Sequence, residues 1–585
     1  MRNAEGREAT KIASKIRKSS QCDEIVTLVP LRQIGRLGDV YRLNLLQDLS
    51  MRSLQPSNFN LPAVLAALGS LFLVLSQSAL GVEEVVTFYI REYRVDGAKR
   101  LKNLEVEEAV YPFLGPARTP NDVEQARMAL EKVYHDKGFQ TVSVNVPQQD
   151  PRRGVIRLEV VENKVGRLRV NGARWFLPSQ IKREAPSIAE GNVPDLKQVG
   201  KEIVALNRLG DRRVTPVLRQ GVEPGTVDID LNVEDKLPLH GSLELNNRYS
   251  ANTTPLRVNG SLSYGNLFQL GHTGGLSFQI APENTNDALV FSGYYLARIS
   301  EGMSLMAQAT KQDSNVSTLG GGAVAGRGEI AGLRMLLDLP TTPKFYQNVT
   351  LGIDWKNLEE DIVIGDDIIS SPIEYYPLSA NYMATWMHDT SFTALNTSLN
   401  FSLRGAGDSE EDYANKRYNA DGSYVYLRGD LAHTRDLPGN CQLFGKFQGQ
   451  VASQPLVNTE QFAGGGLDTV RGYLEATVLG DNGFFGTVEF LSPSLIGNST
   501  DAGKVLDREP NEWRFFAFSD AGMVGIYDAL PGQESQFSLA SLGIGSRVKF
   551  QKHYNGSVDV AYPLVEQADT DQGEVRVTFR SWAEF

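Results

Sequence analysis

The chain has 585 residues, of which 41% are hydrophobic, and its formal net charge is -12. A chain of this length is expected to hold more than one domain, and its acidic balance argues against nucleic acid as a partner. A mean hydropathy of -0.26 excludes a bundle of membrane-spanning helices, whereas a membrane barrel remains compatible with it, because barrel strands alternate lipid-facing and lumen-facing residues.

One long apolar segment lies near the N-terminus, at residues 61–75. It is shorter than the roughly 20 residues that a helix needs to cross a bilayer. It follows Met51 and is followed by small residues at the -3 and -1 positions of a cleavage site after Gly81. This pattern predicts a secretory signal peptide over residues 51–81. Residues 1–50 show little periodicity, so we expect translation to begin at Met51; the rival reading is a cytosolic extension on an anchored protein.

The residues that usually carry chemistry are sparse. Loss of residues 1–81 would remove ten basic and six acidic residues, take the net charge to -16, and leave Cys441 as the one cysteine. No intramolecular disulfide or cysteine metal cluster is then expected. The six histidines are far apart and never reach a zinc-like spacing. Neither a nucleophile elbow nor a phosphate-binding loop occurs in a strand-to-helix setting. We therefore expect no cofactor and no enzymatic activity.

From residue 86 the patterns predict two small α+β units with the same order of strand, helix, helix, strand, strand. The first unit, 86–163, has predicted elements at 87–95, 104–114, 119–138, 141–146 and 155–161. The second unit, 164–236, has them at 166–170, 179–185, 195–209, 213–218 and 226–233. Thr119, followed by Pro120 and by Asp122 in the first turn, is typical of a helix start. The repeated order indicates an internal duplication.

The remaining residues, 239–585, show short alternating runs instead of helical periods. Sixteen runs are predicted as strands: 239–250, 256–267, 274–280, 288–299, 304–311, 329–339, 349–358, 376–388, 391–404, 424–434, 442–454, 485–491, 513–525, 541–551, 556–564 and 575–585. An even number of strands with long and short connections in turn is typical of bacterial outer-membrane barrels. We therefore expect a transmembrane antiparallel β-barrel of about 16 strands after two α+β domains; the rival for single strands is a soluble β-sandwich.

A glycine-rich loop with one arginine interrupts the barrel pattern at residues 464–473. Glycines let such a loop fold back tightly, and its Arg-Gly-aromatic tip suits a confined polar space such as a barrel lumen. An acid at an inward strand position could hold this arginine by a charge-assisted, bidentate bond. Asp520, within the run 513–525, is the predicted partner of Arg471.

The ordered pair of Val470-Arg471-Gly472-Tyr473 with a later Phe518-x-Asp520-x-Gly522 resembles the outer-membrane transporters of two-partner secretion, the hemolysin secretion/activation (ShlB/FhaC/HecB) family of the POTRA-barrel superfamily. The two α+β units resemble the periplasmic POTRA domains of this family. The resemblance covers residues 86–585. It implies that the barrel translocates an unfolded partner exoprotein, which carries an N-terminal secretion domain, and that the Arg471 loop gates it.

Further expectations follow from the resemblance. The first module recognises the client between its longer helix and the next strand, which points to five residues, Val123, Leu130, Tyr134, Val142 and Val144. A client can also add a strand to an open sheet edge. The terminal Phe585 resembles the signal read by the barrel-assembly machinery, so that machinery, periplasmic chaperones and the lipid bilayer are expected partners. Relatives usually carry a plug helix, but about five residues separate Gly81 from the first strand, so gating is expected to depend on the Arg471 loop.

Two alternatives remain open at this stage. A barrel-insertion factor of the same superfamily usually carries more POTRA units than the two that fit before the barrel. A passive porin needs no periplasmic modules, so loss of residues 86–235 would leave its function unaffected.

Overall fold

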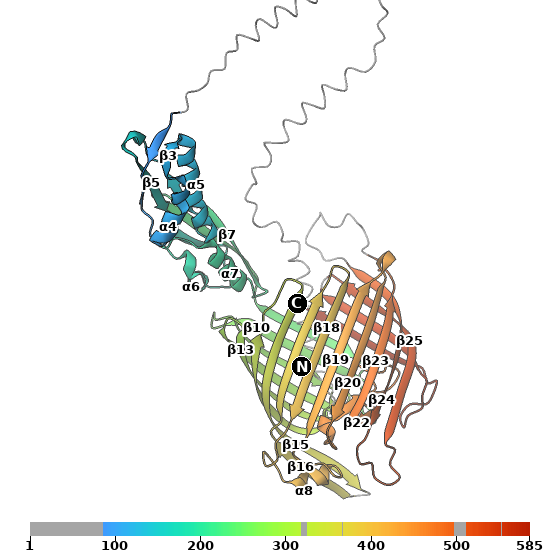
Figure 1. Cartoon of the computed structure of the whole chain (residues 1–585). Helices are drawn as coiled ribbons and strands as arrows, with labels where there is room; N and C mark the ends of the chain where they lie inside the picture. The colour runs from blue at the N-terminus through green and yellow to red at the C-terminus, as the bar shows by residue number, and fades with distance from the viewer. Residues whose placement is uncertain (1–85, 318–323, 365–366, 497–510, 552) are drawn as a thin grey trace, which may run out of the picture.

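The computed structural model describes residues 86–585 apart from 318–323, 365–366, 497–510 and 552 (Figure 1). The predicted signal peptide, 51–81, and the residues before the expected translation start, 1–50, lie outside the described residues. Within the described part of the chain, no helix is long and apolar enough to cross a membrane.

The first module is a three-stranded sheet covered by two helices. Its elements are β1 (Phe88–Ile90), β2 (Glu92–Asp96), α4 (Asn103–Val110), β3 (Gly115–Arg118), α5 (Pro120–Asp136), β4 (Val142–Asn145) and β5 (Val155–Glu162). The sheet order is β2-β5-β4, with β2 parallel to β5 and β4 antiparallel to it. Strands β1 and β3 form a separate antiparallel pair that the sequence patterns did not predict.

Helix α5 starts where its sequence predicts. The Thr119 hydroxyl accepts the backbone N–H of Asp122 at 3.3 Å, and the Asp122 carboxylate accepts the Thr119 backbone N–H at 2.7 Å. This reciprocal pair satisfies two of the amides that every helix start leaves without a helical partner. The Thr119 hydroxyl also donates to the Asp122 carboxylate at 2.7 Å, and this bond, together with the one from the Thr119 backbone N–H, holds the pKa of Asp122 below its usual range.

The second module repeats this topology. Its elements are β6 (Lys164–Asn171), α6 (Pro178–Arg183), α7 (Leu196–Leu206), β7 (Arg212–Gln220) and β8 (Thr226–Asp235). The sheet order is β6-β8-β7, again with a parallel first-to-last pair and an antiparallel edge strand. Both modules therefore have the predicted strand, helix, helix, strand, strand order.

The residues that the resemblance assigned to client binding lie in the core of the first module. Their side chains are between 0% and 7% exposed and form one cluster: Val123, Leu130, Tyr134, Val142 and Val144. The helical period of α5 directs one apolar face at the sheet, and alternate residues of β4 point to the helix-covered face of that sheet, so these side chains meet. We therefore reassign the five residues to the core, and a client would meet the exposed residues and the backbone edge instead.

The Leu130→Ala variant tests this reassignment. Leu130 is fully buried, so its truncation should lower the unfolding free energy of the fragment 86–235 by about 2–5 kcal/mol. Urea denaturation followed by circular dichroism measures the change. The control is Met128→Ala on the same helix, whose side chain is 55% exposed and should shift stability by less than about 0.5 kcal/mol. Equal effects of the two variants would contradict the assignment.

Sixteen antiparallel strands close the barrel. They are β9 (Leu239–Asn246), β10 (Arg257–Leu267), β11 (His272–Ile280), β12 (Ala288–Ser300), β13 (Met303–Ser317), β14 (Val324–Asp338), β15 (Phe345–Ile364), β17 (Leu378–Met387), β18 (Ser391–Phe401), β19 (Val425–Asp436), β20 (Gln442–Ala452), β23 (Asn482–Leu491), β24 (Glu512–Gly525), β25 (Gln536–Phe550), β26 (Tyr554–Pro563) and β27 (Arg576–Glu584). Each contains or overlaps one predicted run, so the predicted fold class is confirmed.

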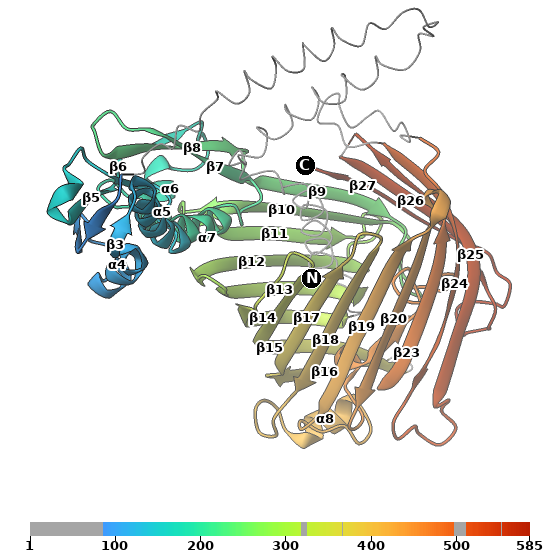
Figure 2. The ribbon, with the colours of Figure 1, turned by 45° about the horizontal axis from the view of Figure 1, so that its top comes forward.

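The barrel closes between its last and first strands, which lie side by side in Figure 2. The pairing runs from Arg580 opposite Asn246 to Glu584 opposite Ser242. Phe585 extends it, because its N–H donates to the Gly241 carbonyl at 3.0 Å. The alternation predicted for this strand is present: Val575, Val577 and Phe585 are exposed on the outer face.

One hairpin arm extends beyond the barrel wall. The strand β16 (Asp367–Tyr375) pairs with the distal part of β15, while β17 pairs with the proximal part. The connection after β18 contains the short helix α8 (Glu410–Lys416). Figure 1 shows both elements at the end of the barrel opposite the two modules. The sequence patterns predicted neither β16 nor α8.

The second module contacts the turn between β10 and β11, at the end of the barrel opposite β16 and α8. Gln269, in the turn between β10 and β11, accepts the Leu177 backbone N–H at 3.0 Å and donates to the Trp175 carbonyl at 3.2 Å. His240 of β9 contacts Asp211 at 2.8 Å. These contacts fix the second module, rather than the first, to the barrel.

Candidate functional site

The glycine-rich loop belongs to the connection between β20 and β23, residues 453–481. Within it, β21 (Phe462–Gly464) and β22 (Val478–Gly480) pair as a short hairpin. We call residues 465–477, between these two strands, the inserted loop. Its tip carries Arg471, which is 4% exposed, and Val470, which is fully buried.

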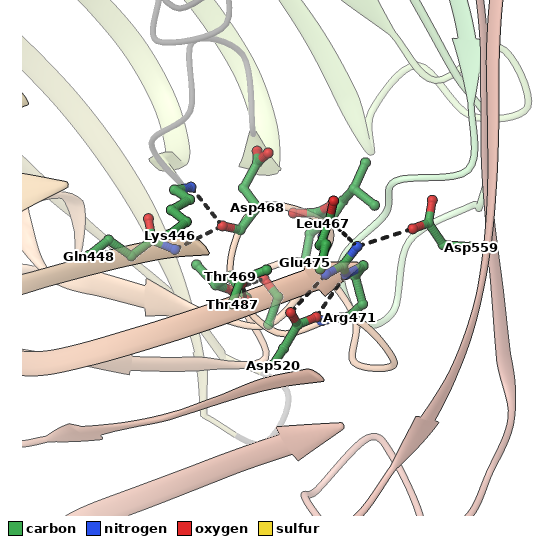
Figure 3. A network of polar contacts seen from close by, with 12 residues as sticks. Lys446, Gln448, Leu467, Asp468, Thr469, Arg471, Glu475, Thr487, Asp520 and Asp559 are labelled. Carbon is green, nitrogen blue, oxygen red and sulfur yellow. Dashed lines mark hydrogen bonds and ion pairs between the residues drawn. The ribbon is translucent and has the colours of Figure 1, made fainter. Parts of the chain in front are cut away.

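Arg471 binds Asp520 of β24 in a bidentate ion pair (Figure 3). Its Nε lies 2.7 Å from one carboxylate oxygen and its Nη2 lies 2.8 Å from the other. The backbone N–H of Arg471 also donates to this carboxylate at 3.1 Å. Asp520 is 1% exposed, so three donors of one residue satisfy a carboxylate that is withdrawn from bulk water.

Two further carboxylates meet the same guanidinium. Nη1 of Arg471 lies 2.6 Å from Glu489 of β23 and 3.3 Å from Asp559 of β26. Arg547 of β25 binds Glu489 at 2.9 Å. We call these five residues, Arg471, Glu489, Asp520, Arg547 and Asp559, the Arg471 hub. The hub holds two cations and three anions, so loss of Arg471 would leave three acids around one arginine.

The wall carboxylates of the hub face the lumen. Their strand neighbours are exposed on the outer face, at 55% for Val488, 49% for Phe490 and 44% for Val558. Successive residues of a strand point to opposite faces, so Glu489 and Asp559 point inward. The guanidinium also lies over the ring of Phe518, 3.5 Å from its centroid, which adds a cation–π contact.

Gly472 and Tyr473 complete the tip. Gly472 has a φ of 95°, a conformation that only glycine adopts without strain. The Tyr473 hydroxyl donates toward the Val565 carbonyl at 2.7 Å and accepts the Val565 backbone N–H at 3.2 Å. The motif Val-Arg-Gly-Tyr therefore places an apolar side chain, an ion pair, a left-handed turn and a hydroxyl contact in succession.

The Gly472→Ala variant should loosen the tip. A methyl group at this φ costs about 1–2 kcal/mol. We therefore expect a several-fold loss of the exoprotein translocation that the resemblance implies, with normal insertion of the barrel. Immunoblotting of heat-treated and unheated outer membranes measures insertion. The matched control is Gly445→Ala in β20, where an added Cβ meets no atom closer than 4.0 Å. Equal effects of both variants would show that the tip conformation is unimportant.

Gly522 is needed for packing rather than for flexibility. It lies opposite Phe485 of β23, and a Cβ on it would fall 2.1 Å from the Phe484 carbonyl oxygen. The buried Phe485 ring packs with Val470 and Tyr473 in one cluster. Gly522 therefore allows two strands to approach closely beside the inserted loop.

The inserted loop is also tied to the first barrel strand. Arg248, two residues after β9, is 6% exposed and binds Glu475 at 2.7 Å and Asp468 at 2.6 Å. The Asp468 carbonyl accepts hydrogen bonds from Lys446 and Gln448 of β20 at 3.0 and 2.8 Å (Figure 3). The loop is thus held at its tip by β23, β24 and β26 and nearer its ends by β20 and by the residues after β9.

The structure brings together the predicted pair, Arg471 and Asp520, with Phe518 beneath the guanidinium. The sequence reasoning missed Glu489, Arg547, Asp559 and Arg248. A signal for the two acids was present, because each is a single acid inside an otherwise apolar run, Gly-Thr-Val-Glu-Phe and Ser-Val-Asp-Val-Ala. Arg248 lies in a connection, where no periodicity predicts the direction of its side chain.

Comparisons with known proteins agree with this architecture. A family model described as "POTRA domain, ShlB-type" matches residues 88–163, and one described as "Haemolysin secretion/activation protein ShlB/FhaC/HecB" matches residues 348–548. Among curated proteins, the outer membrane transporter CdiB of Dickeya dadantii (strain 3937) is 24% identical over 181 residues. CdiB of Escherichia coli O6:K15:H31 is 26% identical over 179 residues. These matches span 31% of this chain and about a third of the length of the relatives, 32% and 30%.

Solved structures extend the likeness in fold to most of the chain. CdiB from Escherichia coli has a TM-score of 0.56 at 18% identity, covering 94% of this chain and 97% of that chain. BamA from Haemophilus ducreyi lacking POTRA domains 1–3 has a TM-score of 0.52 at 14% identity, covering 86% and 100%. Both likenesses show the fold alone. The two family matches and the outer-membrane transporter relatives place the barrel in the outer membrane and the first module in the periplasm, and they make this chain similar to the ShlB/FhaC/HecB transporters of two-partner secretion.

Proposed function

We propose that this chain translocates an unfolded partner exoprotein across the outer membrane and that the inserted loop gates the passage. The observation that carries the proposal is the Arg471 hub, a buried set of ion pairs that holds a loop inside a closed barrel. A polar loop held by desolvated charges has one defined position, because any shift leaves at least one buried charge unpaired. Such a loop suits a gate with a closed state and an open state.

The gate opens when the inserted loop leaves the hub. In that movement Arg471 gives up three carboxylates, and Arg248 gives up Asp468 and Glu475. The free-energy cost of breaking these ion pairs is reduced if a client segment or water solvates the freed carboxylates in the same step. The outer membrane offers no ATP, so we assign the work to client binding and to folding of the client outside the cell.

We assign client capture to the modules, with domains at 86–163 and 164–236 before a barrel at 239–585. The edge strand β4 offers one site for strand addition. Two side chains of α5 now occupy its outward carbonyls: Arg127 donates to the Val144 carbonyl at 3.2 Å, and the His135 ring lies 3.2 Å from the Val142 carbonyl. A client strand would displace these two side chains. In biogenesis, the expected partners are the barrel-assembly machinery, reading Phe585, and periplasmic chaperones.

A strain that lacks this chain tests the proposal. Mass spectrometry of the culture medium and of shaved cell-surface peptides, compared with the wild type, should show the loss of one large protein. Complementation with the full chain should restore it. A strain in which many outer-membrane barrels fall together, while the secreted proteins stay unchanged, would instead show a barrel-insertion factor. An unchanged protein set with altered small-solute uptake would show a passive pore.

A further inference from the structure

The connection between β18 and β19 folds back on the segment that carries the inserted loop. We call residues 402–424, which include α8, the outer cap. Its buried side chains form one cluster with β16 and with the start of the 453–481 segment. The main members, all between 0% and 3% exposed, are Tyr375, Tyr413, Tyr424, Leu456 and Val457. The outer cap therefore packs against the same continuous segment that places Arg471 in the lumen.

Glu460 lies at the centre of this contact, two residues before β21. Its side chain is 3% exposed and accepts hydrogen bonds from Lys356 at 2.5 Å, from the Tyr375 hydroxyl at 2.7 Å and from the Tyr426 hydroxyl at 2.7 Å. Its backbone carbonyl accepts Arg428 at 3.0 Å. The wall strands β15 and β19 and the extended arm β16 thus meet on one carboxylate.

Asp481 makes the matching contact at the other end, one residue after β22. It is fully buried, and its two oxygens accept hydrogen bonds from Arg417 at 2.9 Å and from the backbone N–H groups of Leu456 and Tyr527 at 2.8 and 2.7 Å. Arg417 directly follows α8, and Tyr527 lies in the connection after β24. One carboxylate therefore ties the outer cap to both sides of the β21–β22 hairpin.

We propose that Glu460 and Asp481 are positioning residues that latch the outer cap to the inserted loop, so that the outer mouth and the Arg471 hub open together. The two carboxylates flank the hairpin on which the inserted loop is mounted. A shift of the loop pulls on both carboxylates. Release of Asp481 frees Arg417 of the cap, and release of Glu460 frees Tyr375 and Tyr426, whose rings pack on Tyr413 and Tyr424 of the cap. The inference deepens the proposed gating, but its test needs no client, so it can fail while secretion itself stands.

The test is trypsin cleavage at the end of α8 on intact cells. Lys416 and Arg417 are the cleavable residues, and the Arg417 side chain is 14% exposed because it is bound to Asp481. In Asp481→Asn, one amide oxygen replaces the two carboxylate oxygens that accept four donors, from Arg417, Leu456, Gln461 and Tyr527, and the amide nitrogen would face one of these donors. We expect cleavage after residue 416 or 417 to be at least about tenfold faster, since hydrogen bonds to charged groups are the strong ones.

The matched control is Asp528→Asn, which makes the same change of a carboxylate to an amide at the acceptor of an exposed 3.2 Å hydrogen bond from Asn419 of the same cap. Its cleavage rate should stay within about twofold of the wild type. If Asp481→Asn is absent from the outer membrane, Tyr426→Phe replaces it, because that variant keeps the ring and removes one donor to Glu460. It should raise the cleavage rate several-fold.

Coupling to the hub is tested in the same assay. Arg471→Ala should also accelerate cleavage in the outer cap, and Asp481→Asn combined with Arg471→Ala should add little to the larger single effect. Two results overturn the inference. One is wild-type protection in a folded Asp481→Asn or Tyr426→Phe barrel. The other is wild-type protection of the cap in Arg471→Ala, which would show that the hub and the cap move independently.

Discussion

Arg471→Ala should yield a barrel that inserts normally and secretes about 1% or less of the wild-type amount of its partner. Removing one member of a buried ion pair costs about 3–5 kcal/mol, because it leaves the other charge buried and unpaired. Here the loss leaves Asp520 and Asp559 without their guanidinium and Glu489 with Arg547 alone. The inserted loop should then leave its position. Quantitative immunoblotting of medium and outer membrane measures both outcomes.

Arg334→Ala is the matched control for this variant. Arg334 makes an equally bidentate pair with Asp354, at 2.7 and 2.8 Å, but it joins two neighbouring wall strands and no loop. Its loss should leave secretion close to the wild-type level. Arg471→Lys should restore the charge without the bidentate geometry and recover secretion only in part. Normal secretion by a normally inserted Arg471→Ala barrel would contradict the role assigned to the hub.

Deletion of the first module, residues 86–163, should abolish secretion and leave the barrel intact. The barrel is docked to the second module alone in the contacts described above, through Gln269 and through the Asp211–His240 contact. The deletion therefore removes client capture without disturbing the barrel. Conductance of the purified protein in planar bilayers checks the barrel, and the medium of expressing cells checks secretion.

Undiminished secretion after this deletion would contradict client capture by the first module. Loss of conductance together with loss of secretion would trace the defect to assembly of the barrel. Met128→Ala, which changes an exposed side chain of the module without unfolding it, is the control for expression and export.

The barrel was predictable because its signal is a simple alternation. Each of the sixteen predicted runs corresponds to a strand, and the last run ends on Phe585 as the pairing with Gly241 requires. The ends of the strands were predicted less accurately than their existence. The run that becomes β15 was predicted to end at residue 358, whereas the strand continues to Ile364. Beyond the membrane, strands need no lipid-facing apolar face, so alternation no longer reports them.

In the modules and at the site, too, only features that a local sequence pattern encodes could be predicted. The Thr119 cap was predictable because it is encoded within four neighbouring residues. The buried residues of α5 and β4 were assigned to client binding through the resemblance, and a period cannot tell a core face from a binding face. The Arg471–Asp520 contact was expected from the resemblance and from the position of Asp520 as the one acid of the predicted run 513–525. The side chains of Arg248, Glu460 and Asp481 bind residues from 20 to 227 positions away, which no local pattern reveals.

The most direct test of outward transport is the location of the partner protein in cells with and without this chain. Cells that lack the chain are fractionated, and the protein that is missing from the medium is measured in the periplasm and outside. We predict that it accumulates, intact or degraded, in the periplasm and appears outside when the full chain is expressed again, but not when Arg471→Ala is expressed. The same amount outside the cell in all three strains would contradict the account.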